Sequence, residues 1–151
     1  MTLSAGNYSY ANVLINQKGT LILSGGVYHF ASLDIRQHAK LLFAGASEVR
    51  VKNELDTDSN AYIGPAPDTD VLPRQIVFYV EGTDDKGRPH PGDEELAQTV
   101  AQFGQRNTVL ANVYAPNGTI LLRANTEAIG AFIGKQVHIG QRVELTLDSG
   151  F

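Results

Sequence analysis

The acidic segment Asp56-Thr57-Asp58-Ser59-Asn60 carries oxygen-bearing side chains at alternating positions. Carboxylate and amide oxygens at this spacing are typical of loops that bind Ca²⁺, a hard cation that prefers oxygen ligands. An EF-hand loop has glycine at its sixth position and glutamate at its twelfth, whereas this chain has Ala61 and Pro67 there. The segment therefore predicts a calcium site made of Asp56, Asp58 and Asn60, with a solvated polar loop as the alternative.

Charged side chains suited to acid–base chemistry are spread along the chain. Enzymes that cleave acidic polysaccharides on a β-helix use carboxylates and basic residues on one outer face, often with calcium. The basic residues expected to point outward are Arg36, His38, Arg50, Lys52, Arg123, Lys135, His138 and Arg142. Matching acidic partners are not evident, the four histidines lack metal-ligand spacing, and the chain has no cysteine. We therefore predict a non-enzymatic protein with a solvated charged face and no catalytic residue.

Composition and charge narrow the possible partners. The chain has 151 residues, 42% of them hydrophobic, which suits one soluble domain. A formal net charge of −4 without a basic run disfavours nucleic acid as a partner. No apolar run approaches the roughly 18 residues of a membrane helix, so we predict no membrane span in this chain. The first repeat starts in register and no secretion signal precedes it, which suggests a piece of a longer protein.

An internal repeat at the start of the chain positions these residues. Shifting residues 3–39 by 20 positions aligns chemically similar side chains almost throughout. The pairs include Leu3 with Leu23, Gly6 with Gly26, Tyr8 with Tyr28, Ile15 with Ile35 and Gln17 with Gln37. A repeat of this length is typical of one solenoid coil.

Apolar residues two apart within each repeat, bounded by glycine-containing turns, indicate short β-strands. Parallel stacking places equivalent positions of successive coils about 4.8 Å apart, so the tube interior takes the apolar positions. Those expected inside the early coils are Leu3, Tyr8, Val13, Ile15, Leu21, Leu23, Tyr28, Phe30, Leu33, Ile35, Leu41 and Phe43. Those expected inside the later coils are Ile76, Phe78, Val113, Ile120, Leu122, Phe132, Val137, Ile139 and Leu145. Gly26 and Gly134 are expected at corners with positive φ.

The C-terminal part has a similar repeat with a shorter period. Val109, Ala111, Val113 and Ala115 precede Ala128, Gly130, Phe132 and Gly134 by 19 residues, and Ile120 and Leu122 precede Val137 and Ile139 by 17. The sequence thus predicts a single all-β domain over residues 1–151, a parallel solenoid of about six coils of 17–20 residues.

Two polar segments, residues 53–75 and 81–99, are predicted as loop excursions from one region of the solenoid's flank. If these excursions meet, they would add calcium ligands from Asp68, Asp70, Asp84 and Asp85. Near the end of the second excursion, Asp93 could cap a short helix over residues 93–99, and a strand from Val100 to Phe103 is the equal alternative.

Two phrases resemble a known family. Tyr114 to Gly118 (YAPNG) and Gly130 to Gly140 (GAFIGKQVHIG), with the LSxGxYxF-type repeats at the start, look like a family of short bacterial right-handed β-helix modules of unknown function. These modules occur in secreted, pilus-associated and cell-surface proteins. The resemblance implies a right-handed coil and an extracellular or cell-surface location in a bacterium, and it implies no catalytic residue. More distantly, the fold is similar to that of ice-binding β-helices, but Thr-x-Thr pairs at the coil period are absent.

These observations predict a structural and interaction module of a bacterial cell-surface or appendage protein, pilus-associated by resemblance, with a rigid solenoid face for adhesion or assembly. Expected partners are other protein subunits or surface glycans, and no cofactor is expected beyond the calcium described above. One alternative is a scaffold that polymerises end to end through its open coil ends, as the bactofilins do. A second alternative is a carbohydrate-binding or carbohydrate-cleaving β-helix.

Overall fold

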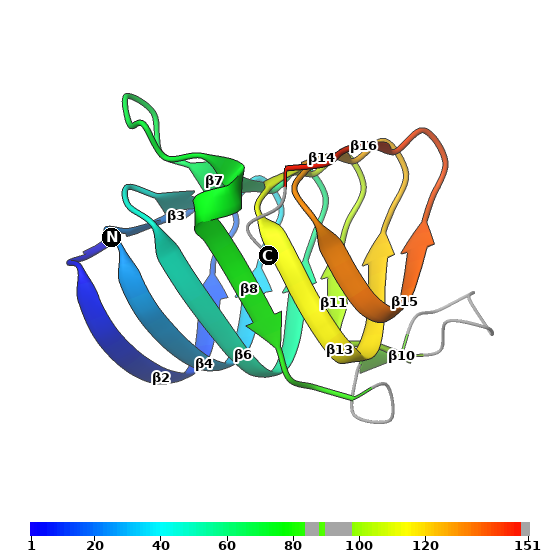
Figure 1. Cartoon of the computed structure of the whole chain (residues 1–151), viewed down its shortest axis with the longest axis horizontal. Helices are drawn as coiled ribbons and strands as arrows, with labels where there is room; N and C mark the ends of the chain where they lie inside the picture. The colour runs from blue at the N-terminus through cyan, green and yellow to red at the C-terminus, as the bar shows by residue number, and fades with distance from the viewer. Residues whose placement is uncertain (84–87, 90–97, 149–151) are drawn as a thin grey trace.

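The protein is a parallel β-solenoid, as the repeat predicts (Figure 1). The computed structural model describes residues 1–83, 88–89 and 98–148. Each coil has three sides. Two sides come from one long curved strand, and the third comes from a short strand that follows a turn.

The long strands bend at a corner, so their first halves form face 1 and their second halves form face 2. They are β2 (Gly6–Ile15), β4 (Gly26–Ile35), β6 (Ser47–Thr57), β13 (Asn112–Leu122) and β15 (Phe132–Ile139). The short strands form face 3. They are β1 (Thr2–Leu3), β3 (Thr20–Leu23), β5 (Lys40–Phe43), β7 (Tyr62–Pro65), β12 (Thr108–Leu110), β14 (Glu127–Ile129) and β16 (Glu144–Thr146).

Strand pairing follows the predicted offsets in both halves. Gly6 pairs with Gly26 and Ile15 with Ile35, an offset of 20 residues. Val113 pairs with Phe132 at an offset of 19, and Leu122 pairs with Ile139 at an offset of 17. The register shifts between Ala115 and Thr119, where the sequence predicts the two-residue shortening.

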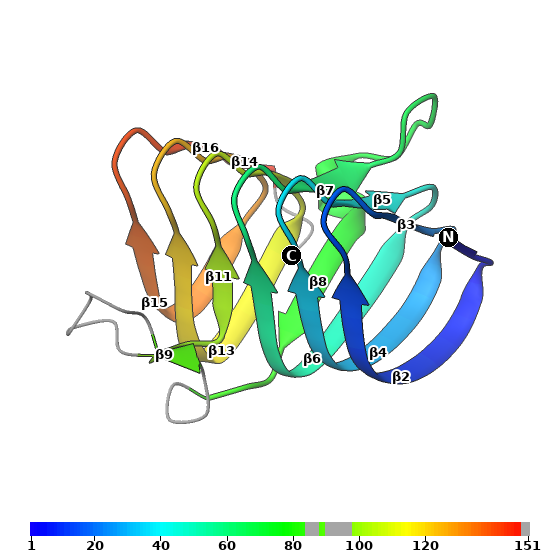
Figure 2. The same ribbon diagram turned by 180° about the vertical axis from the view of Figure 1, so that it is seen from behind.

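The fourth coil is divided in two. Strand β8 (Ile76–Val80) lies on face 1 beside the first half of β6, and β11 (Ala101–Phe103) lies on face 2 beside its second half. Both pair with β13 on the other side, and Figure 2 shows β11 between β6 and β13. Strands β8 and β11 are therefore the two halves of one long strand, and the second excursion is inserted at its corner.

The excursions differ from the prediction in extent and place. Residues 53–57 belong to β6, in which residues 54–57 pair with β4 and residues 55–57 also pair with β11. Strand β7 follows at Tyr62, so the first excursion occupies only residues 66–75. It ends in a short 3₁₀ helix, Pro73–Gln75. The two excursions leave opposite ends of β8, which Figure 1 shows, and not one region of the flank.

The segment predicted as helix or strand near residue 100 is strand where it is described. Strand β10 (Gln98–Thr99) pairs antiparallel with β9 (Arg88–Pro89), and β11 follows directly. Positions 93–97 of the predicted helix lie outside the described residues. No helix among the described residues is long and apolar enough to cross a membrane.

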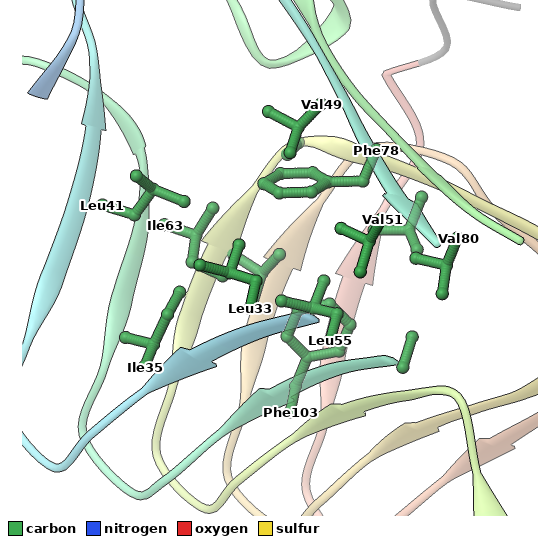
Figure 3. Packing of buried hydrophobic residues seen from close by; sticks show 14 of the residues in the cluster. Leu33, Ile35, Leu41, Val49, Val51, Leu55, Ile63, Phe78, Val80 and Phe103 are labelled. Atoms are coloured by element: carbon green, nitrogen blue, oxygen red, sulfur yellow. The ribbon is translucent and has the colours of Figure 1, made fainter. Parts of the chain in front are cut away.

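Apolar side chains from all three faces fill the interior. In Figure 3, Leu33, Val49 and Phe78 come from three successive coils and lie in the same interior. Phe43 from face 3 contacts Phe78 from face 1 edge to face, with ring centroids 5.9 Å apart. The predicted interior residues from Ile15 to Leu122 are all buried.

The two ends of the tube are uncovered. At the C-terminal end, Val137, Ile139 and Leu145 occupy interior positions but are 36%, 52% and 43% exposed, because the described residues form no coil beyond them. At the N-terminal end Tyr10, whose partner Phe30 is buried, is 40% exposed. The predicted assignment of Val137, Ile139 and Leu145 to the interior row is confirmed by their pairing with buried residues. Tyr10 belongs to the same kind of row, although the sequence analysis did not place it there.

Six residues with left-handed backbone stack at the corner between faces 2 and 3, each the third residue of its turn. They have φ between 55° and 62° and are Lys18, His38, Asn60, Arg106, Asn125 and Arg142. The N–H of such a residue donates to the carbonyl of the next coil's turn, as from Asn60 to Gln105 (2.9 Å). Gly26 has the predicted positive φ (107°) at a different corner, but Gly134 does not belong to this class.

Candidate functional site

The predicted calcium residues lie at the end of β6 and in the turn after it. Asp56 is a half-buried face 2 residue, Thr57 points into the core, and Asn60 is the left-handed residue of the turn. The Asp58 carboxylate lies 3.8 Å from the guanidinium of Arg36 on the preceding coil. The residues therefore follow the strand and corner geometry of an ordinary coil and not that of a loop closed around a cation.

Charge around this segment is already balanced in part by protein cations. Asp58 lines a polar hollow of about 460 Å³ together with Arg123, and it also pairs with Arg36. Among the described residues, no group of three or more His, Cys, Asp or Glu side chains is placed to hold a metal. Asp68 and Asp70 lie on the first excursion, whereas Asp84 and Asp85 fall outside the described residues. The calcium site stays a prediction, for which the test is a calcium-dependent rise in Tm that Asp58→Asn abolishes.

A different feature arises at the corner between faces 1 and 2 in the third coil. Phe30 pairs with Val51 and Ser32 pairs with Glu54, so Ala31 alone lies opposite two residues of β6, Lys52 and Asn53. One extra residue of this kind is a β-bulge, which bends the strand and redirects side chains. The bulge leaves Lys52 exposed at the corner.

The chain after β8 packs directly against this bulge. Gly82 is buried, and a Cβ on it would lie 1.8 Å from the Asn53 carbonyl oxygen. Only glycine fits so close an approach. The contact holds the preceding residue, Glu81, beside the corner.

A hollow of about 250 Å³ lies over this corner and crosses four coils. It is lined by Ser9, Tyr10, His29, Phe30, Ala31, Arg50, Lys52 and Glu81. Its polar lining residues Ser9, His29, Arg50, Lys52 and Glu81 are exposed. The lining therefore combines several hydrogen-bond donors with one carboxylate.

Arg50 is held in place by two neighbours. Its Nε donates to Glu48 Oε1 at 2.5 Å, and its guanidinium carbon lies 5.1 Å from the centroid of the Tyr79 ring. Both contacts restrict the side chain. The ion pair engages only Nε, so the N–H donors of the two Nη groups remain for a ligand. Arg50 is thus a preorganised donor at the edge of the hollow.

Arg50 belongs to a row of outward residues on face 1 with one member per coil. The pairings that define the row link Ser9, His29, Arg50, Tyr79, Tyr114 and Ile133 in this order. Tyr79 and Tyr114 pack edge to face with ring centroids 5.9 Å apart. Since paired positions of neighbouring strands are about 4.8 Å apart, the row has a fixed spacing along the solenoid axis.

Sequence reasoning placed Arg50 and Lys52 on the outside but did not join them with His29 or Glu81. A signal was present for the bulge, because the offset between the second and third coils grows from 21 residues at Tyr28 and Val49 to 22 at Ser32 and Glu54. The position of Glu81 depends on how the second excursion leaves the coil, which no repeat describes.

Comparison with known proteins gives a family without a described activity. The sequence profile of a domain of unknown function (DUF7305) matches residues 2–150. No curated protein and no solved structure matches the chain.

Proposed function

The chain belongs to the DUF7305 family, and we propose that it serves as a non-enzymatic structural and interaction module of a bacterial cell-surface or appendage protein. In this function the solenoid is a rigid support, and face 1 is the surface that meets a partner. Partners of this kind are another protein subunit or a surface glycan.

The observation that carries the proposal is the face 1 row. A solenoid core fixes every outward side chain of one position at a constant axial interval, and the six row members span all six coils of that face. Such an array favours an extended or repeating partner over a small diffusible substrate. The similarity of Tyr114–Gly118 and Gly130–Gly140 to bacterial surface modules supports a surface location.

The test is surface labelling of intact bacterial cells that produce the natural full-length protein. Lys18, Lys40 and Lys135 are exposed, so an amine-reactive biotin that cannot cross membranes should label this domain before lysis. A cytoplasmic protein produced in the same cells is the control. Labelling of the domain only after lysis would overturn the surface location.

A scaffold that polymerises end to end is a second candidate, and the uncovered apolar ends favour it. Leu147 is 76% exposed and Ile139 is 52% exposed at one end, and Met1 is 81% exposed at the other. Open strands at both ends also present unpaired backbone groups, which promote association. Light scattering over a concentration series separates this candidate from a module that acts through its faces.

A further inference from the structure

We propose that the hollow at the bulged corner binds a carboxylated sugar unit of an acidic glycan. This inference rests on the proposed interaction function and names the partner of its face 1 side. It is carried by the hollow, by the side chains gathered there, and by the restriction placed on Arg50.

The donors of the hollow suit a carboxylate. Arg50 and Lys52 are both exposed cations on β6, two positions apart and therefore on the same side of the strand. A guanidinium with free terminal NH₂ groups binds a carboxylate with two parallel hydrogen bonds, and an ammonium adds a further charge. The Glu48 and Tyr79 contacts hold Arg50 before the ligand arrives, which lowers the entropy cost of binding.

The remaining lining residues suit the hydroxyl groups of a sugar. Glu81 accepts hydrogen bonds from hydroxyls, while Ser9 and His29 donate or accept them. Tyr10 also lines the hollow, next to Ser9 on β2. Glu81 in the lining and Glu48 beside Arg50 would repel a doubly charged phosphate monoester more strongly than a carboxylate, so the mixed lining favours a singly charged, hydroxyl-rich ligand.

The dimensions favour a chain of sugars over a free monosaccharide. The hollow touches β2, β4, β6 and the residue after β8, which are successive coils of face 1. Three inter-strand steps correspond to about 14 Å along the solenoid axis. A glycan laid along this direction would place one carboxylated unit at Arg50 and Lys52 and its neighbours over the adjoining coils.

The experiment is titration calorimetry at low salt, with oligogalacturonate as the acidic probe and a galactose oligomer of equal length as the neutral probe. Binding should occur with the acidic oligomer and be at least about tenfold weaker with the neutral one. Lys52→Gln should weaken acidic binding about three- to tenfold, as expected for loss of one partly exposed charge contact. The matched control is Lys135→Gln, which removes the same charge from an exposed site on β15 and should leave binding unchanged.

Three results would overturn the inference: absence of binding, equal affinity for both oligomers, or equal weakening by both lysine substitutions, which would indicate diffuse attraction without a site. Arg50→Gln provides a second test. We expect it to weaken binding of the acidic oligomer more than Lys52→Gln does, provided that its melting curve shows a folded protein. None of these results bears on surface labelling of intact cells, so failure of the glycan site is distinguishable from failure of the proposed function.

Discussion

Tyr28 is the residue that ties the first two coils together at the corner between faces 3 and 1. Its hydroxyl donates to the Gly25 carbonyl (2.9 Å) and accepts from the Gly25 N–H (3.2 Å), and its ring stacks on Tyr8 with centroids 5.7 Å apart. The hydroxyl also lies 3.4 Å from the Ser4 carbonyl oxygen of the first coil, to which it can donate. Tyr28→Phe keeps the stacking and loses all of these hydrogen bonds. We expect the variant to lose about 1–2 kcal/mol of unfolding free energy at neutral pH, measured by denaturant titration.

The same tyrosine predicts a pH dependence. Burial raises the pKa of Tyr28 above its ordinary value of 10.0, and burial also raises the pKa of Tyr62. A raised folded-state pKa contributes stability that is present below about pH 10 and is lost as the pH rises through the folded-state value. Between pH 8 and pH 11 the wild type should therefore lose more stability than Tyr28→Phe. Identical slopes in the two proteins would contradict this role of Tyr28.

Ile35 tests the interior assignment at a single position. It is 1% exposed and lies between Ile15 and Thr57 of the adjoining coils. Ile35→Asp buries a carboxylate among apolar groups, which should cost more than about 4 kcal/mol and unfold the N-terminal coils. Gln37→Asp is the matched control, because Gln37 is exposed in the following turn. A wild-type melting curve for Ile35→Asp would refute the assignment.

At the scale of elements, the corner between faces 3 and 1 depends on glycine in one coil and not in the coil before it. Gly26 has φ 107°, and a Cβ there would lie 2.0 Å from the Gly6 carbonyl oxygen. Its register partner Gly6 lacks a positive φ, and a Cβ there would meet the Tyr8 ring at 3.2 Å. Gly26→Ala should lower the unfolding free energy by at least about 3 kcal/mol, and Gly6→Ala by under about 1 kcal/mol. Thermal melting of the two variants measures the difference.

Elements that repeat were predictable from the sequence, because parallel stacking requires similar residues at equivalent positions of successive coils. The offset of 20 residues gave the register of β2 and β4, and the offsets of 19 and 17 gave that of β13 and β15. The turn of the third coil was harder to predict. Its turn, Asp58 to Ala61, has the composition of a solvated loop, yet Asn60 takes the left-handed conformation that Lys18 and His38 take in the earlier turns. Polar composition therefore marked a corner and not the start of an excursion.

The hollow could not be predicted because it depends on positions that break the repeat. Lys52 reaches the corner through an extra residue in one strand, and Glu81 arrives there through the close contact of Gly82 with the Asn53 carbonyl. The position of Glu81 follows from how an insertion interrupts the fourth coil between β8 and β11, and the bulge at Lys52 lies in the coil before it. The joining of His29, Arg50 and Glu81 is a property of three-dimensional stacking, which the spacing of single residues does not reveal.

At the scale of the whole molecule, the number of strand layers restricts end-to-end association. Face 3 has seven strands in the described structure, whereas the other sheet has seven strands of which β8 and β11 share one layer, leaving six layers. If β2 of a second copy pairs with β15, its β1 falls on the place of β16. If instead its β1 pairs with β16, one layer between β15 and β2 stays empty. Continuous stacking therefore requires β1 to leave its place or another segment to fill the layer.

Deletion of residues 1–5 removes this conflict and tests the argument. In the shortened chain β2 can continue β15, which places Tyr8 over Phe132, Tyr10 over Gly134 and Val13 over Val137 in the register of the inner coils. Light scattering with size-exclusion chromatography should show a monomer for residues 1–151 across a concentration series and growing oligomers for the deletion. Filaments of the intact chain at all concentrations would instead mean that β1 is displaced readily, because it pairs through only two residues. In that case the coil ends, and not face 1, would be the principal interaction surface.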